Sequence, residues 1–225
     1  MKKIILLTSL LLFFTGSAWA STFYYDDIYA NWPGYFIDPR DEIGIPQINV
    51  VTVNIENNYL KYVEINMKSS YRIPWDIGPN DPYFDALFIN TNWNGTYGDY
   101  QSWDYYIRDD TQIDNSDGKL YTVSTVYNYI FATGTDLRAG HPAGIEPTYL
   151  TEISGILDGV NWTPNTLRYS FKDNKILIED KFVIGWSVWC ANDVFLTQVP
   201  EPGILILLGI GLSAVGLVAR RYKKI

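Results

Sequence analysis

The sequence predicts an all-β domain, an antiparallel β-sandwich that is jelly-roll-like, and three observations support this. Apolar and polar residues alternate in several short segments rich in Val, Ile and aromatic side chains. Asn and Asp residues, which favour turns, separate some of these segments. Between residues 21 and 198 no stretch shows a convincing helical face over about twelve residues. Many short strands joined by turns are typical of β-sandwiches.

The alternation locates the individual strands. A turn is expected at Asn57-Asn58, because both side chains tolerate positive φ. Residues 167–171 and 176–179 are expected to pair as a hairpin around Asp173-Asn174. The other predicted strands cover residues 48–55, 60–67, 86–93, 120–133, 182–189 and 194–197.

Composition excludes several classes of protein. The 225 residues include 17 Lys and Arg, 25 Asp and Glu, one Cys and one His, with a net charge of −8. A single Cys cannot form an intrachain disulfide, and one Cys with one His cannot supply the usual zinc ligands. The acidic balance argues against a nucleic-acid partner, whose phosphates are neutralised by Lys and Arg. The 47% hydrophobic content argues against a disordered chain.

Residues 1–20 have the three parts of a secretory signal peptide. Lys2 and Lys3 form the positive region, residues 4–14 are mostly apolar, and Ala18 and Ala20 supply the small residues before a cleavage site. We therefore expect export through the Sec translocon, with cleavage by signal peptidase before Ser21.

Residues 203–219 form a second apolar segment, of seventeen residues without a charge. As a helix it would be about 26 Å long, slightly shorter than a hydrocarbon core of about 30 Å. A basic tail at residues 220–225 follows, with long side chains that can reach the interface, namely Arg220, Arg221, Lys223 and Lys224. The sequence thus predicts a single C-terminal transmembrane helix, its basic tail in the cytoplasm and the preceding domain across the membrane.

Val199-Pro200-Glu201-Pro202 stands immediately before this apolar segment. Two prolines exclude a helix or a central strand, so the segment is expected to be extended and accessible. The tetrapeptide, the apolar span and the basic end, in this order at the terminus, resemble the PEP-CTERM sorting signal of exported proteins of Gram-negative bacteria. The resemblance covers residues 199–225.

The resemblance implies processing by an exosortase, a transpeptidase-like enzyme of the inner membrane. An inner-membrane intermediate would then precede delivery to the cell surface or extracellular matrix, generally in association with exopolysaccharide. Val199, Pro200, Glu201 and Pro202 would be a recognition site rather than a catalytic one. A permanent single-pass anchor is the alternative.

The segment between the two ends, residues 21–198, is expected to be one domain. The ends hold six of the 17 basic residues, and Glu201 is the only acid outside the domain, so the domain has 11 basic and 24 acidic residues and a net charge of −13. This negative charge disfavours binding of anionic partners and favours binding of cations.

The domain lacks the usual catalytic motifs, and a non-enzymatic protein is predicted. There is no phosphate-binding loop, Gly-x-Ser-x-Gly or His-Glu-x-x-His. His141 lies in a Gly/Pro turn and is expected to be an exposed loop residue. Cys190 is expected to be a small buried thiol in an aromatic strand. Two carboxylates could still serve a polysaccharide hydrolase, which is the least favoured alternative.

No cofactor is expected, although the acidic surplus permits calcium. The densest acidic cluster runs from Asp109 to Gly118 and is expected to be a solvated turn. Asp85 and Asp193 lie in segments similar to a strand and a chain ending of other PEP-CTERM ectodomains of unknown role. That similarity implies a shared fold, in which Asp85 and Asp193 are either structural residues or weak candidates for calcium ligands. Of these two roles, the structural one is favoured, because Asx side chains commonly cap strand ends and form turns.

Six aromatic residues between positions 93 and 106 give the best hint of a ligand. Trp93, Tyr97, Tyr100 and Trp103 are mixed with Asn, Asp and Gln, a combination suited to sugar rings. The same composition describes the partly buried rim of a sandwich. A carbohydrate-binding module, with or without calcium, is therefore the alternative to a non-enzymatic surface or matrix protein associated with exopolysaccharide or biofilm.

Overall fold

The computed structural model describes residues 20–26, 47–68, 85–93, 102–109, 118–132, 141–179, 181–188 and 193–199 of the chain. Within these ranges the chain is all β, apart from a short 3-10 turn at Pro147–Tyr149. The strands are β1 (Ala20–Asp26), β2 (Ile48–Glu56), β3 (Tyr59–Met67), β4 (Asp85–Asn90), β5 (Tyr105–Asp109), β6 (Lys119–Val123), β7 (Tyr129–Phe131), β8 (Pro142–Ile145), β9 (Leu150–Ile153), β10 (Leu157–Thr163), β11 (Thr166–Phe171), β12 (Phe182–Val188) and β13 (Val194–Val199).

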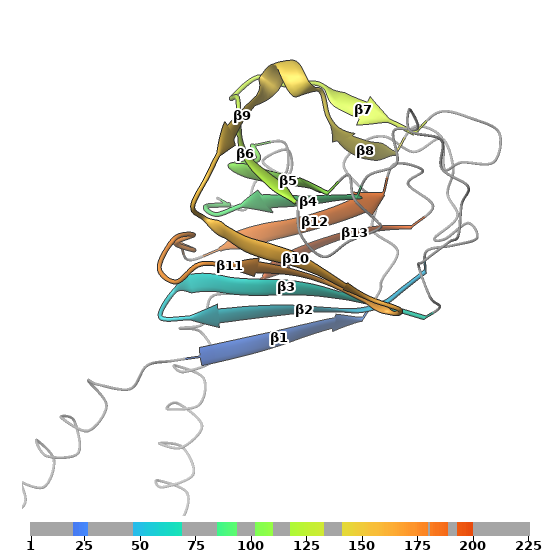
Figure 1. Ribbon diagram of the computed structural model, residues 1–225, viewed down its shortest axis with the longest axis vertical. Helices are drawn as coiled ribbons and strands as arrows, with labels where there is room; N and C mark the ends of the chain where they lie inside the picture. Colours follow the sequence, from blue (N-terminus) through green and yellow to red (C-terminus); the bar gives the residue numbers. More distant parts are fainter. Residues whose placement is uncertain are drawn as a thin grey trace, which may run out of the picture.

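Two antiparallel sheets pack face to face (Figure 1). The first sheet has the order β1-β2-β3-β11-β10, and the second has the order β13-β12-β4-β5-β6-β9. A two-stranded ribbon, β7-β8, lies over the outer face of the second sheet and forms a third layer (Figure 1). The predicted all-β fold is confirmed. The jelly-roll description is wrong, because β1-β2-β3 and β4-β5-β6 each stay within one sheet instead of alternating between the sheets.

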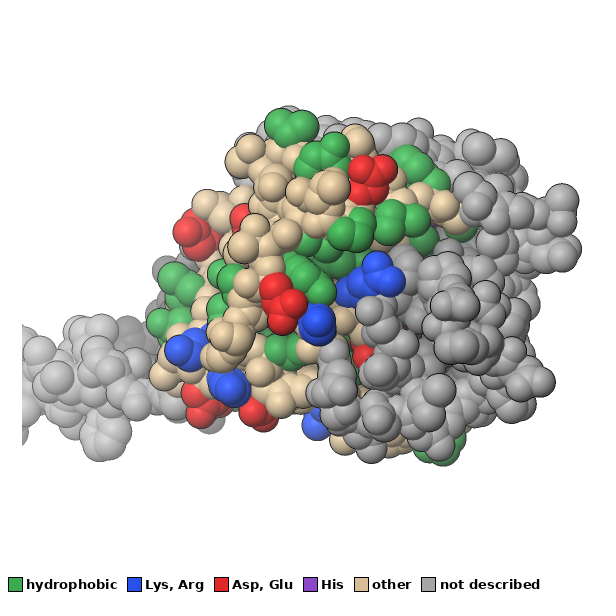
Figure 2. Space-filling view, turned by 45° about the horizontal axis from the view of Figure 1, so that its top comes forward, with side chains coloured by type: hydrophobic (Ala, Val, Ile, Leu, Met, Phe, Trp, Pro, Cys, Tyr) green, Lys and Arg blue, Asp and Glu red, His purple; other side chains and the backbone are tan. Residues whose placement is uncertain are grey.

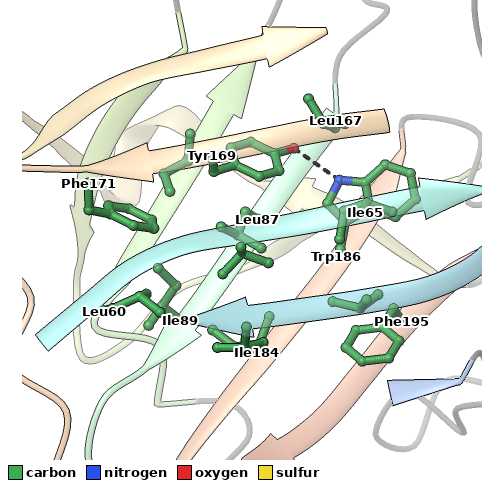
Figure 3. Close-up of a cluster of buried hydrophobic side chains, with 14 of the residues drawn as sticks. Leu60, Ile65, Leu87, Ile89, Leu167, Tyr169, Phe171, Ile184, Trp186 and Phe195 are labelled. Atoms are coloured by element: carbon green, nitrogen blue, oxygen red, sulfur yellow. Dashed lines mark hydrogen bonds between the residues drawn. The ribbon is translucent and has the colours of Figure 1, made fainter. Parts of the chain in front are cut away.

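The main core lies between the two sheets and follows the period-2 alternation of strands. In β11, Leu167, Tyr169 and Phe171 are buried and the residues between them are partly exposed. They meet side chains of the second sheet such as Leu87 and Ile184 (Figure 3). Apolar area removed from water in this layer is the main stabilising contribution to the sandwich.

A second core lies between the second sheet and the β7-β8 ribbon. It explains why β4 and β12 are buried along their whole length, since one side of each strand faces the first sheet and the other faces the ribbon. Phe88, Tyr106 and Val183 point into this layer, together with Ala143 and Ile145 of β8. The nearly continuous apolar character of these two strands is the sequence signal for burial on both faces.

Several predicted strands are confirmed, and two predicted segments are arranged differently from the prediction. The Asn57-Asn58 turn has φ values of 53° and 65° and joins β2 to β3. The predicted strand at residues 120–133 is two strands, β6 and β7, which belong to different sheets. The predicted hairpin of residues 167–179 is wrong, because β11 pairs with β3 and β10.

Residues 172–181, which we call the crossing segment, instead carry the chain from the first sheet to the second. The Ile178 amide donates to the Asn58 carbonyl at 2.8 Å, and the Glu179 amide donates to the Thr91 carbonyl at 3.0 Å. Asn174 still has the positive φ expected of a turn, 56°. The predicted turn at Asp173-Asn174 is therefore confirmed, whereas residues 176–179 do not pair with β11 as predicted.

Candidate functional site

The predicted sorting signal begins at an edge of the sandwich. β13 lies at one edge of the second sheet, and within the described part of the chain it pairs only with β12. Its last residue, Val199, pairs with Phe182. The strand is extended and lies at a sheet edge, and an edge is where a strand tolerates the prolines that follow it. Pro200, Glu201 and Pro202, the apolar span 203–219, and Arg220, Arg221, Lys223 and Lys224 lie outside the described residues.

Both ends of the sandwich chain lie at the same end of the molecule. Ala20 pairs with Glu56, beside the Asn57-Asn58 turn. The crossing segment contacts that turn and then leads into Phe182, the partner of Val199 (Figure 1). We call this the terminal end of the sandwich. Ala20, at the predicted signal-peptide boundary, and Val199, at the start of the predicted sorting signal, therefore lie at the same end of the sandwich.

The crossing segment closes the core at the terminal end. Ile176 and Ile178 are buried in the main core, whereas Leu177 between them is 51% exposed. Lys61 forms a salt bridge with Asp173 of this segment and lies 3.5 Å from Glu56. The hydrogen bond to Asp173 raises the pKa of the Lys61 ammonium, and burial partly opposes this. On the face presented in Figure 2, acidic and basic side chains are interspersed.

Of the four candidate sugar-binding aromatics, Trp103 is buried rather than available to a ligand. Trp103 is only 2% exposed and packs against Phe88 with ring centroids 5.4 Å apart. Its indole Nε1 donates to the Tyr129 hydroxyl at 2.7 Å. This ring offers no free face for a sugar, because it fills the space between β4 and the β7-β8 ribbon. Trp93 is partly buried against the same cluster, and Tyr97 and Tyr100 lie outside the described residues.

Three buried aspartates, two in strands of the second sheet and one immediately before β13, accept hydrogen bonds from the first sheet. The Tyr169 hydroxyl donates to Asp85, and the Trp162 indole donates to Asp109 at 2.7 Å. The Ile48 amide donates to Asp193 at 2.6 Å. These bonds cluster at the end of the sandwich opposite the terminal end, where β4 begins and β5 ends. Asp85 and Asp193 thus have a structural role that links the two sheets.

The structure corrects the prediction for two polar residues. Asp109 was expected in a solvated turn, but it is the last residue of β5 and is buried. The signal was available, because Tyr105, Ile107 and Asp109 share one face of a strand by alternation. His141 was expected to be exposed, but it is buried immediately before β8, whose ribbon covers the second sheet.

The described residues were compared with the predictions for a metal site and for the residues with catalytic chemistry. No three His, Cys, Asp or Glu side chains among them are grouped so as to hold a metal ion. The buried Ser187 hydroxyl donates to the backbone carbonyl of Pro142 at 2.8 Å. Cys190 and residues 110–117 of the acidic cluster lie outside the described part of the chain.

A search of family models finds the PEP-CTERM protein-sorting motif at residues 198–224. The chain therefore carries a PEP-CTERM sorting motif, as the resemblance indicated, and this motif marks an exported substrate for exosortase processing. No curated protein and no solved structure matches the chain significantly. Among the described residues no helix is long and apolar enough to cross a membrane, and the predicted membrane helix lies outside them.

Proposed function

We propose that this protein is a non-enzymatic surface or matrix protein, exported by Sec and processed by an exosortase at its C-terminus. The observation that carries the proposal is the sorting motif at residues 198–224, attached directly to an edge strand of the folded domain. Signal peptidase removes residues 1–20, residues 203–219 hold the intermediate in the inner membrane, and exosortase then separates the domain from that anchor.

The buried polar groups support a structural rather than a catalytic domain. Asp85, Asp109 and Asp193 each accept a hydrogen bond that joins the two sheets. A general acid or base must reach a proton on the substrate, whereas these carboxylates are buried between the sheets. The domain in this proposal is a stable β-sandwich that associates with exopolysaccharide outside the cell.

Processing is tested by following the full chain in cells that contain or lack the cognate exosortase. Antibodies against the domain and against the basic tail should detect the intermediate in the inner membrane, and only the domain antibody should detect the mature species. Replacing Pro200, Glu201 and Pro202 by Ala should leave both epitopes on one membrane species. Glu152→Ala, an exposed acid in β9, is the matched control and should mature normally. Equal maturation of the motif variant, or a wild type that keeps both epitopes, would refute the proposal.

Exopolysaccharide association is tested separately on the secreted protein. The mature wild-type protein should co-sediment with the native exopolysaccharide of the producing cells. Equal recovery of the protein in the soluble fraction with and without polysaccharide would remove this part of the proposal and leave the processing part intact.

A further inference from the structure

Two residues belong both to the sandwich and to the sorting motif. The motif begins at Gln198, and β13 extends to Val199. In the antiparallel pairing with β12, Gln198 lies opposite Val183 and Val199 lies opposite Phe182. The folded domain therefore holds the first part of the motif in a β-sheet, directly beside Pro200.

A processing enzyme has to bind the chain on both sides of the bond that it cleaves. Such enzymes take a substrate segment in an extended form and use its backbone and side chains for recognition. The backbone of Gln198 and Val199 is extended, but it is paired with β12. Local opening of those pairs makes the segment available without unfolding the domain.

The structure favours opening from the Val199 end of β13. Among the described residues β13 is an edge strand, so it can separate there without breaking any other strand pair that the structure describes. Near the other end of the strand, Phe195 is buried and packs against Tyr25 of β1, with ring centroids 6.2 Å apart. The beginning of β13 is thus fixed by packing on the first sheet.

We infer that the terminal pairs of β13 open before processing and that their pairing with β12 limits the rate at which exosortase uses this substrate. The inference rests on the proposed function, since it assumes that exosortase is the processing enzyme. The apparent affinity of an enzyme for a substrate is reduced by the fraction of substrate in the competent state. Release of Gln198 and Val199 from the sheet should therefore accelerate processing at limiting enzyme.

The test inserts residues between Thr197 and Gln198, which leaves residues 198–224 of the motif intact. A Gly-Ser insertion preserves the two-residue period of the strand, so that the new residues occupy the places opposite Val183 and Phe182. A second variant carries an eight-residue Gly/Ser insertion at the same position. The measurement is the rate of precursor conversion in pulse-chase experiments with exosortase at limiting level.

Release from pairing predicts that the two-residue insertion raises the rate by about three- to tenfold and that the longer one adds little more. Hydrogen exchange of the Gln198 and Val199 amides should accelerate in both variants. The control is the same Gly-Ser insertion between Ser154 and Gly155, two exposed residues outside β12 and β13, which should leave the rate unchanged.

Equal rates for the wild type and both β13 insertions would overturn the inference. A gain that grows with insertion length would also overturn it, because clearance of the folded domain from the enzyme would then be limiting. Failure of the proposed function is distinguishable, since wild type and all variants would then remain unprocessed with or without exosortase.

Discussion

At the scale of single residues, side-chain chemistry alone did not indicate which aromatic and acidic residues are accessible. Trp103 was a candidate sugar contact, with a partly buried rim as the alternative, and Asp109 was expected in a solvated turn; both are buried. Each belongs to a layer that neighbouring strands complete, the β7-β8 ribbon for Trp103 and the first sheet for Asp109. The sequence around Trp103 does not contain the β7-β8 ribbon, so the burial of Trp103 could not be read locally. For Asp109 the local alternation with Tyr105 and Ile107 does place the residue on one face of a strand.

Trp103 should act as a core residue rather than as a sugar contact. We expect Trp103→Ala to lower the free energy of unfolding by about 3–5 kcal/mol, because it opens a cavity beside Phe88. Trp103→Phe keeps most of the ring and should lose about 1 kcal/mol for the hydrogen bond to Tyr129. Urea denaturation measures both. Unchanged stability of Trp103→Ala, combined with loss of polysaccharide binding, would contradict this assignment.

Asp109 should stabilise the contact between the two sheets. Asp109→Ala leaves the buried Trp162 indole without this acceptor and should cost about 1–3 kcal/mol in denaturation experiments. Asp109→Asn retains an oxygen acceptor and should cost less. In a protein that already carries Trp162→Phe, Asp109→Ala should lower the free energy of unfolding by less than it does in the wild type. Additive losses of unfolding free energy for the two substitutions would show that the hydrogen bond does not contribute as argued.

Stability should fall in alkaline solution because of buried tyrosines. Burial, followed by the charge of Asp85, raises the pKa of Tyr169 well above 10.0, and burial also raises the pKa of Tyr25 and Tyr105. Above about pH 10 the unfolded chain loses these protons while the folded chain keeps them, so stability decreases as the pH rises.

Each retained proton contributes a slope of up to about 1.4 kcal/mol per pH unit in this range. Urea denaturation from about pH 8 to about pH 11 should show a smaller slope for Tyr169→Phe than for wild type. Tyr24→Phe, at an exposed tyrosine, is the control for general effects of the substitution. A slope that Tyr169→Phe leaves unaltered would contradict the role assigned to this residue.

At the scale of elements, the crossing segment shows where reading the sequence succeeds and where it stops. Alternation in residues 167–171 and 176–179 identified extended chain, and Asp173-Asn174 identified a turn. Alternation fixes which residues share a face, but it contains no information on which strand lies alongside. β11 therefore pairs with β3 and β10, while residues 176–179 close the core between the sheets.

Five strands are absent from the prediction, namely β1, β5, β8, β9 and β10, and two of them show why. β1 directly follows the apolar signal region, and β8 contains Pro142 and Gly144, residues that are poor strand formers. Both are stabilised by pairing, β1 with β2 and β8 with β7. In contrast, β2, β3 and β12 are rich in Val and Ile or in apolar residues and were identified from the sequence alone.

Neighbouring residues of the crossing segment provide a direct test of its packing. Ile176→Ala should destabilise the domain by about 2–5 kcal/mol, because the side chain is buried in the main core. Leu177→Ala should change stability by less than about 1 kcal/mol, since this side chain is 51% exposed. The denaturant midpoints of Ile176→Ala and Leu177→Ala, compared with that of the wild type, measure both effects. Similar losses for the two variants would show that the segment is packed differently.

At the scale of the whole molecule, an acidic sandwich stands between a predicted signal peptide and a PEP-CTERM sorting motif. The terminal end gathers Ala20 and Val199, so the signal-peptide junction and the sorting motif leave the domain on the same side. A chain held by both segments would present this end to the membrane and the buried Asp85, Asp109 and Asp193 end away from it. Under our proposal, the processing segment would then lie on the side of the domain that faces the membrane enzyme.

The most direct test of the central claim is the intact mass of the protein recovered from outside the cell. Our account predicts a species that begins at Ser21 and lacks residues 203–225, formed only in cells with the cognate exosortase. A cell-surface or extracellular protein that retains Ile225, with the same mass in cells with and without exosortase, would contradict it.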